Sequence, residues 1–254
     1  MRELPLFPLH LVLCPGIALP LHIFEPRYRE MVGHCLETGS PFGVVLIRDG
    51  REVGPLAGHI ADVGTTAAIR QAGRYPDGRL HIVSVGEQRF RIRTVDSASA
   101  PYLLGTVDEL DEPLGGPKPA ADALALAVGE RFIAYLEQLQ PAGAVDAGDL
   151  GASDAAAADA TDDAHDPVDD ALRLEQLLAS ARHLIAEGDA TAISYLLTGL
   201  VQLDLAARQE LLEIPDTMAR LRRLDTHLTR ERHLLKRHLR PMALDLEILA
   251  LRKN

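Results

Sequence analysis

The alternation of apolar and polar residues is most regular between residues 60 and 95. Two runs rich in β-branched residues, 60–71 and 80–95, flank a turn at 75–78 with the sequence YPDG. In the second run, apolar residues recur mostly at alternate positions, as expected for a strand that buries one face. Proline in the second and glycine in the fourth turn position are typical of a type I turn closed by a glycine bulge. The pattern therefore predicts a β-hairpin, with a bulge or bend at Gly86.

Four more runs within the first 112 residues predict further strands, namely 4–13, 17–23, 42–47 and 102–110. Glycine, proline and aspartate separate them, as is typical of turns. One helix interrupts the series: Pro26 suits its first position, Met31 and Cys35 share a face, and Gly39 ends it. Short strands at regular spacing favour a small closed or partly closed barrel with one inserted helix.

The second half of the chain has helical periodicity, at 119–140 and again from about 167 to 239. Asp189 and Asp204 are predicted helix N-caps, and Pro215 is expected to open the last long helix. Residues 141–166 hold mostly alanine, glycine and aspartate, which predicts a disordered loop. We therefore expect an α+β fold with a β-barrel domain at 1–118, a first helix at 119–140, an acidic loop at 141–166 and a helical bundle at 167–254.

The net charge of −11 is concentrated in one segment. Between Phe132 and Leu172 there are ten acids (Glu137 and nine aspartates) and no lysine or arginine. The rest of the chain holds 27 acids and 26 bases and is therefore close to neutral. Residues 220–240 are basic, with eight lysines and arginines against Asp225 and Glu231. This excess indicates either a solvated helix face or a docking face for an acidic partner or nucleic acid. A further hypothesis is that the acidic segment screens this helix.

Motifs for catalysis or cofactor binding are missing from the sequence. The lysines at 118, 236 and 253 do not follow glycine, which excludes a typical phosphate-binding loop. GxSxG, HExxH, CxxC and GxGxxG are also absent, and no two histidines are spaced to bind a metal from one helix face. We therefore expect no enzyme activity, cofactor or metal. Cys14 and Cys35 are expected to be packed thiols of a cytoplasmic protein, since we find neither a signal peptide nor an apolar run long enough to span a membrane.

Four segments carry a family resemblance: LPLFPL at 4–9, LPLHIFEPRY at 19–28, GEQRF at 86–90 and RQELLE at 208–213. In this order they resemble the LON domain, the N-terminal substrate-binding domain of Lon (La-type) ATP-dependent proteases. That domain also occurs alone in small bacterial proteins. The resemblance implies a PUA-like β pseudo-barrel followed by helices, with polypeptides as partners. The ATPase and the Ser-Lys peptidase of complete Lon proteases have no counterpart among the motifs here.

The same resemblance implies that Phe24, Arg27 and Tyr28 lie near the face proposed for substrates, with Leu6 and Phe7 as weaker candidates. The alternative is structural, because buried packing is the usual fate of such apolar residues. In that case Phe24 and Leu6 belong to the core and Arg27 is a surface charge at the start of the helix.

The function expected from these observations is a non-catalytic module that binds unfolded or extended polypeptides, as an adaptor or chaperone-like factor. A protease or unfoldase would then be contacted in trans. One alternative is an RNA-binding PUA-like protein, although residues 1–112 hold 14 acids and 11 bases. The other is an enzyme whose site is assembled across strands from Asp62, Glu87, His59 and His81.

Overall fold

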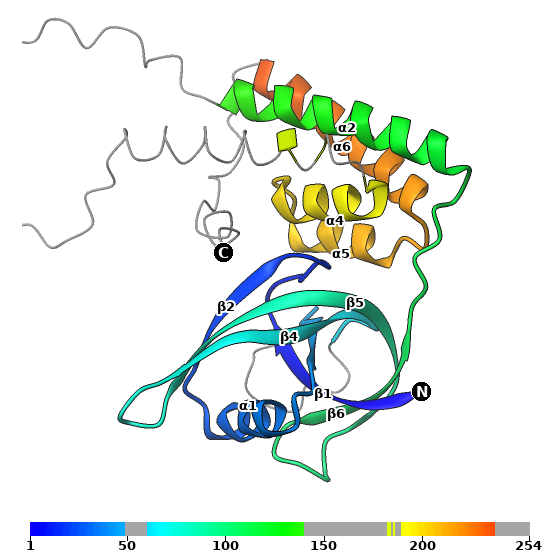
Figure 1. The fold of residues 1–254 in the computed structure, drawn as a ribbon. Coiled ribbons are helices and arrows are strands. Elements are labelled where there is room, and N and C mark those ends of the chain that lie inside the picture. Colours follow the sequence, from blue (N-terminus) through cyan, green and yellow to red (C-terminus); the bar gives the residue numbers. More distant parts are fainter. Residues whose placement is uncertain (49–59, 140–181, 184, 186–188, 237–254) are drawn as a thin grey trace, which may run out of the picture.

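The computed structural model describes residues 1–48, 60–139, 182–183, 185 and 189–236. The strands and helix α1 occupy the N-terminal part, and helices α2, α4, α5 and α6 form a second layer on one side of the sheet (Figure 1). A mixed α+β fold with a six-stranded sheet is thus confirmed. None of the helices in the described ranges is long and apolar enough to cross a membrane.

The sheet is closed on itself. Its strands are β1 (Arg2–Leu9), β2 (Ala18–Ile23), β3 (Phe42–Leu46), β4 (Val63–Arg74), β5 (Leu80–Asp96) and β6 (Leu103–Glu109). The order is β2-β5-β4-β3-β1-β6, and β5 also pairs with β6, so β1, β3, β4, β5 and β6 form a ring. Closure removes the free edges along which sheets aggregate. Strand β2 lies outside this ring and pairs with β5. The closer likeness to a PUA-like barrel stays a prediction.

The β4–β5 hairpin has the predicted turn and bulge. The amide of Gly78 donates to the carbonyl of Tyr75 at 2.9 Å, and Gly78 has a φ of +85°, which closes a type I turn with a glycine bulge. The register shifts between Thr65 and Ala67, where β5 carries the extra residue next to Gly86. Gly86 also exchanges backbone hydrogen bonds with the loop before β2, donating to Ile17 and accepting from Gly16.

The helices begin and end close to the predicted positions. They are α1 (Pro26–Thr38), α2 (Lys118–Leu139), α4 (Ala190–Leu200), α5 (Leu205–Glu213) and α6 (Thr217–Lys236). Asp189 and Asp204 are N-caps, as predicted, and accept from the amides of Thr191 and Ala207. One prediction was wrong: α6 begins at Thr217 and not at Pro215, because the side chain of Asp216 accepts from Ala219 and caps the helix.

Helices α2 and α6 run side by side in the same direction. Arg131 of α2 pairs with Asp225 of α6, and the inner face of α6 is fully buried at Leu221, Leu224 and Leu228. Helices α4 and α5 lie between this pair and the sheet (Figure 1). The predicted acidic loop at 141–166, most of 167–188 and the end of the chain from 237 lie outside the described residues.

A buried polar network joins the sheet to the helices. Arg89 of β5 is 1% exposed, and its guanidinium donates to Glu112 at 2.7 Å and to the carbonyls of Leu212 and Ile214, both at 2.7 Å. Arg220 of α6 is 0% exposed and lies 3.5 Å from the same Glu112 carboxylate. One carboxylate therefore lies between two buried guanidiniums, and Arg89 satisfies carbonyls at the α5–α6 connection.

Tyr195 of α4 completes this network. Its hydroxyl donates to Glu112 at 2.5 Å, and the guanidinium of Arg220 lies 3.9 Å from its ring centroid. Burial raises the pKa of Tyr195, so the hydroxyl stays protonated as a donor. Arg220 also donates to Ser194 at 2.9 Å. We call Arg89, Glu112, Tyr195 and Arg220 the hub.

The first prediction concerns the charge of Glu112. Glu112→Gln is expected to lower the free energy of unfolding by about 3 kcal/mol, because it leaves two buried guanidiniums without a counter-charge. The matched control is Glu109→Gln at the end of β6, which breaks an exposed pair with Arg2 and should cost less than about 1 kcal/mol. Denaturant unfolding measures both values, and similar losses in the two variants would contradict the structural role of the hub.

The second prediction concerns close backbone approach at Gly86. A Cβ added there would lie 2.4 Å from the carbonyl oxygen of Cys14, so Gly86→Ala must move backbone and should cost about 2 kcal/mol or more. Gly33→Ala is the control, since a Cβ within α1 would meet nothing within 4 Å and should stabilise the helix by about 1 kcal/mol. Thermal unfolding should thus shift in opposite directions, and a tolerated Gly86→Ala would show that the bulge can be repacked.

Candidate functional site

The candidate site is on a three-stranded arm that extends from the ring (Figure 1). The arm consists of β2, the first part of β5 and the last part of β4, with β5 in the middle. On β5, Val83 pairs with Pro20 on one side and Gln71 on the other, and His81 pairs with His22 and Gly73. Strands β2 and β5 are paired over six consecutive residues without a register shift.

The two faces of the arm differ in burial. Leu80 and Ile82 of β5 are buried and belong to the core that contains α1. Because side chains alternate along a strand, the residues between them point to the other side. We call this side the outer face, formed by Pro20, His22, Phe24, Gln71, Tyr75, His81 and Val83. All of these residues are exposed or half-buried.

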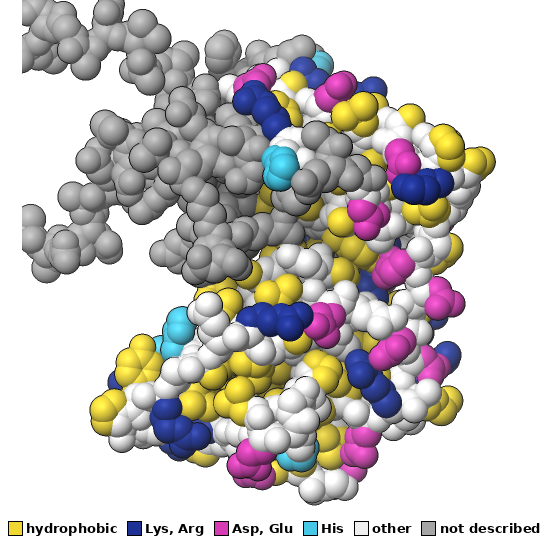
Figure 2. Space-filling view, in the orientation of Figure 1, with side chains coloured by type: hydrophobic (Ala, Val, Ile, Leu, Met, Phe, Trp, Pro, Cys, Tyr) yellow, Lys and Arg dark blue, Asp and Glu magenta, His cyan; other side chains and the backbone are white. Residues whose placement is uncertain are grey.

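Aromatic side chains gather at the end of the outer face. The ring of His22 stacks on Tyr75 with centroids 5.6 Å apart and an angle of 10°, and Phe24 lies 6.4 Å from His22. The Arg79 guanidinium lies 5.6 Å from the Tyr75 ring centroid. Figure 2 shows hydrophobic, histidine and basic side chains together at the end of the hairpin. Exposed rings beside a guanidinium are typical of surfaces that bind other proteins.

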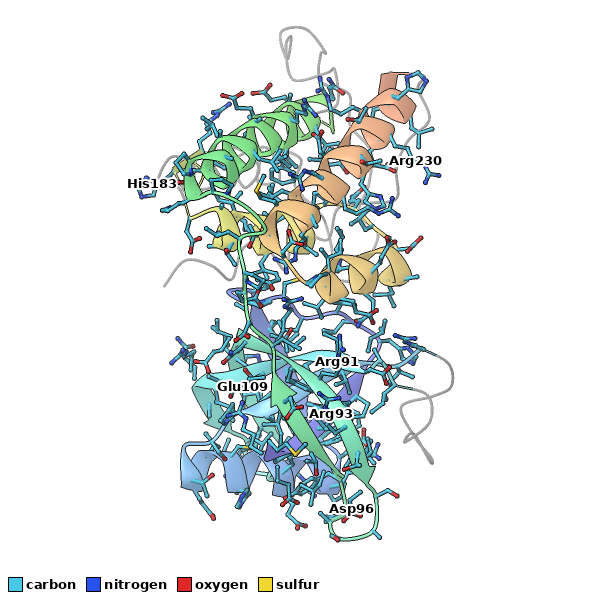
Figure 3. All side chains as sticks on the ribbon, turned by 90° about the vertical axis from the view of Figure 1, so that its right-hand side faces the viewer. Arg91, Arg93, Asp96, Glu109, His183 and Arg230 are labelled. Atoms are coloured by element: carbon cyan, nitrogen blue, oxygen red, sulfur yellow. The ribbon has the colours of Figure 1, made fainter. Side chains whose placement is uncertain are left out.

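Large apolar side chains are seldom left this open to water. Phe24 is 63% exposed and Tyr75 is 43% exposed, and the two rings flank the same histidine. The wall formed by β5 and β6 is different, because Arg91, Arg93 and Glu109 project from it (Figure 3) and Arg93 pairs with Asp108. The outer face of the arm is therefore a distinct apolar and aromatic surface.

The five residues predicted from the family resemblance differ in their exposure to solvent. Phe24 lies on the outer face, which excludes the alternative that it is a core residue. Leu6, Phe7 and Tyr28 are buried in the core, where the Phe7 and Tyr28 rings are 4.2 Å apart. Arg27 pairs with Glu25 at 2.8 Å and lies over the Tyr28 ring. Phe7 and Tyr28 thus belong to the core cluster that also contains Leu80 and Ile82 of the arm, and Leu6 belongs to a second cluster with Phe90 and Val107.

The sequence analysis missed Pro20, His22, Tyr75 and Val83. A signal for part of this set was available, because Pro20, His22 and Phe24 alternate with the apolar residues Leu19, Leu21 and Ile23. Tyr75 could not be found in this way, since it opens the turn and reaches His22 only through the pairing of β2 with β5.

The described residues of the predicted cross-strand enzyme site do not form a catalytic cluster. Glu87 is exposed and pairs with Arg70 at 2.8 Å, and His81 lies on the outer face beside His22. Asp62 is exposed, and His59 lies outside the described residues. Within the described ranges, no three histidine, cysteine, aspartate or glutamate side chains are placed to hold a metal ion.

Neither thiol is placed as a nucleophile. Cys14 and Cys35 are both free and buried, as predicted for packed thiols. Burial raises the pKa of Cys14 to about 12 and also raises that of Cys35. The thiolate is the reactive form of cysteine, so both side chains are inert at neutral pH.

Comparison with known proteins agrees with this architecture. The family model of the ATP-dependent protease La (LON) substrate-binding domain matches residues 3–230. The Lon protease of Amoebophilus asiaticus is 26% identical over 209 residues, which are 82% of this chain and 21% of that protein. The Lon protease of Porphyromonas gingivalis is 30% identical over 116 residues, 45% of this chain and 14% of that protein. The chain thus spans about a fifth or less of the length of these curated relatives.

Two solved structures share the fold. A Lon N-terminal domain protein from Xanthomonas campestris has a TM-score of 0.53 and 26% identity, covering 88% of this chain and 97% of that one. The N-terminal domain of the Mycobacterium avium complex Lon protease has a TM-score of 0.57 at 19% identity, covering 90% and 98%. With the family model matched over nearly the whole chain, this protein belongs to the LON substrate-binding domain family.

Proposed function

We propose that this protein binds extended or unfolded polypeptides through the outer face of the arm and catalyses no reaction itself. The observation that carries the proposal is the exposed cluster of Phe24, Tyr75 and His22 next to Pro20 and Val83. Membership in a family described as substrate-binding supports it, since substrates of proteases are proteins.

The shape and chemistry of the outer face suit an unfolded chain. Unfolded proteins expose aromatic and aliphatic side chains, which gain free energy when they leave water against Phe24 and Tyr75. The arm also has a strand edge on β2, where Pro20 lacks an amide donor and keeps other sheets from pairing freely.

The role we propose is that of an adaptor or chaperone-like factor in the cytoplasm. It would hold a polypeptide on the outer face and reach a protease or unfoldase through non-covalent contact. Arg27, at the start of α1, stays a predicted member of the binding set, although its described contacts are with Glu25 and the Tyr28 ring. RNA binding stays the alternative prediction: the exposed rings beside Arg79 can also stack on bases, but residues 1–112 hold 14 acids and 11 bases, which disfavours phosphate binding.

The third prediction tests the outer face. The double variant Phe24→Gln and Tyr75→Gln should bind permanently unfolded, carboxymethylated α-lactalbumin about tenfold more weakly, because exposed aromatic anchors dominate such contacts. Fluorescence anisotropy of the labelled probe measures the Kd. The control is Leu36→Gln with Leu126→Gln, on helices α1 and α2, whose side chains are 41% and 48% exposed but lie off the outer face.

The control variant should retain the affinity of the unchanged protein. Equal weakening in both double variants would mean that binding depends on general surface hydrophobicity and not on the arm. Cleavage of the probe by the purified chain would contradict the non-catalytic part of the proposal.

A further inference from the structure

The exposed side of α6 consists of arginine, threonine and histidine side chains. Between residues 217 and 235, the side chains exposed to solvent are those of Arg222, Thr226, Thr229, Arg230 and His233. They follow one another at spacings of one to four residues that keep them on one side of the helix. None of them is acidic, and we call this set the α6 stripe.

The acids near the α6 stripe are turned toward neighbouring helices. Asp225 pairs with Arg131 of α2, and Glu210 of α5 pairs with Arg223 at 3.0 Å. Glu231 is half-buried on α6, and its charge, after burial, contributes to raising the pKa of Tyr135 of α2 to about 12.

Arg222 and Arg230 are left as free cations within the described part of the chain. No carboxylate there lies within 4.0 Å of either guanidinium. Arg220, counted with the basic residues of this helix in the sequence, is instead buried in the hub and takes no part in the stripe.

We propose that the α6 stripe is a docking surface for an acidic polypeptide segment. Guanidiniums pair well with carboxylates, and the hydroxyl of Thr229 can donate to a carboxylate or backbone oxygen, whereas that of Thr226 donates to the Arg222 carbonyl at 3.1 Å. Arg222 and Arg230 are eight residues apart, about 12 Å along the helix. This spacing suits separate carboxylates along a peptide. The stripe is on a different element from the arm, so this proposal is independent of the proposed function.

A nucleic acid fits the stripe less well. Single strands bind where bases can stack on aromatic side chains, and residues 217–236 contain no phenylalanine, tyrosine or tryptophan.

The fourth prediction uses the full chain and labelled poly-L-glutamate of about twenty residues at low ionic strength. Arg222→Gln with Arg230→Gln should weaken binding about tenfold, since two exposed charge pairs are lost. The control is Arg91→Gln with Arg93→Gln, two exposed arginines of the β5–β6 wall that remove the same charge. Figure 3 shows Arg91 and Arg230 on opposite halves of the molecule. The control should change binding less than twofold.

Three results would overturn the proposal. The first is no binding of poly-L-glutamate by the unchanged chain, and the second is equal weakening in the two double variants, which would reflect net charge alone. The third is tighter binding of single-stranded polyuridylate than of poly-L-glutamate with the same dependence on Arg222 and Arg230, which would assign the stripe to nucleic acid. Thermal unfolding of all variants should match that of the unchanged chain, which would show that the replacements leave the fold intact.

Discussion

The carboxylate of Glu112, held between the buried guanidiniums of Arg89 and Arg220, is the interaction on which the rest of the structure depends. Apolar contacts bring the sheet and the helices together, but hydrophobic burial is not directional. Buried charges are directional, because each must meet its partner or remain uncompensated at a cost of several kcal/mol. The hub therefore fixes the orientation of the helical layer on the ring. Arg89 adds to this by donating hydrogen bonds to the carbonyls of Leu212 and Ile214.

The exposure of the arm follows from the way β5 pairs with its neighbours. The C-terminal part of β5 pairs with β6 and closes the ring. The N-terminal part of the same strand pairs with β2 and with the end of β4, beyond the ring. The inner face of the arm is filled by the core, and its outer face is free to hold Phe24 and Tyr75 in water. A rigid frame lowers the entropic cost of binding, because the contact surface needs little ordering when a polypeptide arrives.

Much of the fold could be predicted because its signals are local. The YPDG turn, the alternation along β5, and the caps at Asp189 and Asp204 each involve residues that are close in sequence. The hub could not be predicted, since Arg89 and Arg220 have the sequence signature of surface charges and are buried only because Glu112 meets them from another segment. The site could be predicted only in part, because exposure also depends on residues distant in sequence. The sequence shows only that Phe24, Phe7 and Leu6 are large and apolar. Contacts with residues distant in sequence bury Phe7 and Leu6 and leave Phe24 exposed.

The central claim is that a polypeptide covers the outer face of the arm, and amide hydrogen exchange of the full chain tests it most directly. Exchange is compared with and without saturating carboxymethylated α-lactalbumin. The account predicts slower exchange at residues 18–24, which comprise β2 and Phe24, and at residues 71–85 of the hairpin, with the β5–β6 wall unchanged. Slower exchange confined to that wall or to the helices, with the arm unaffected, would contradict it.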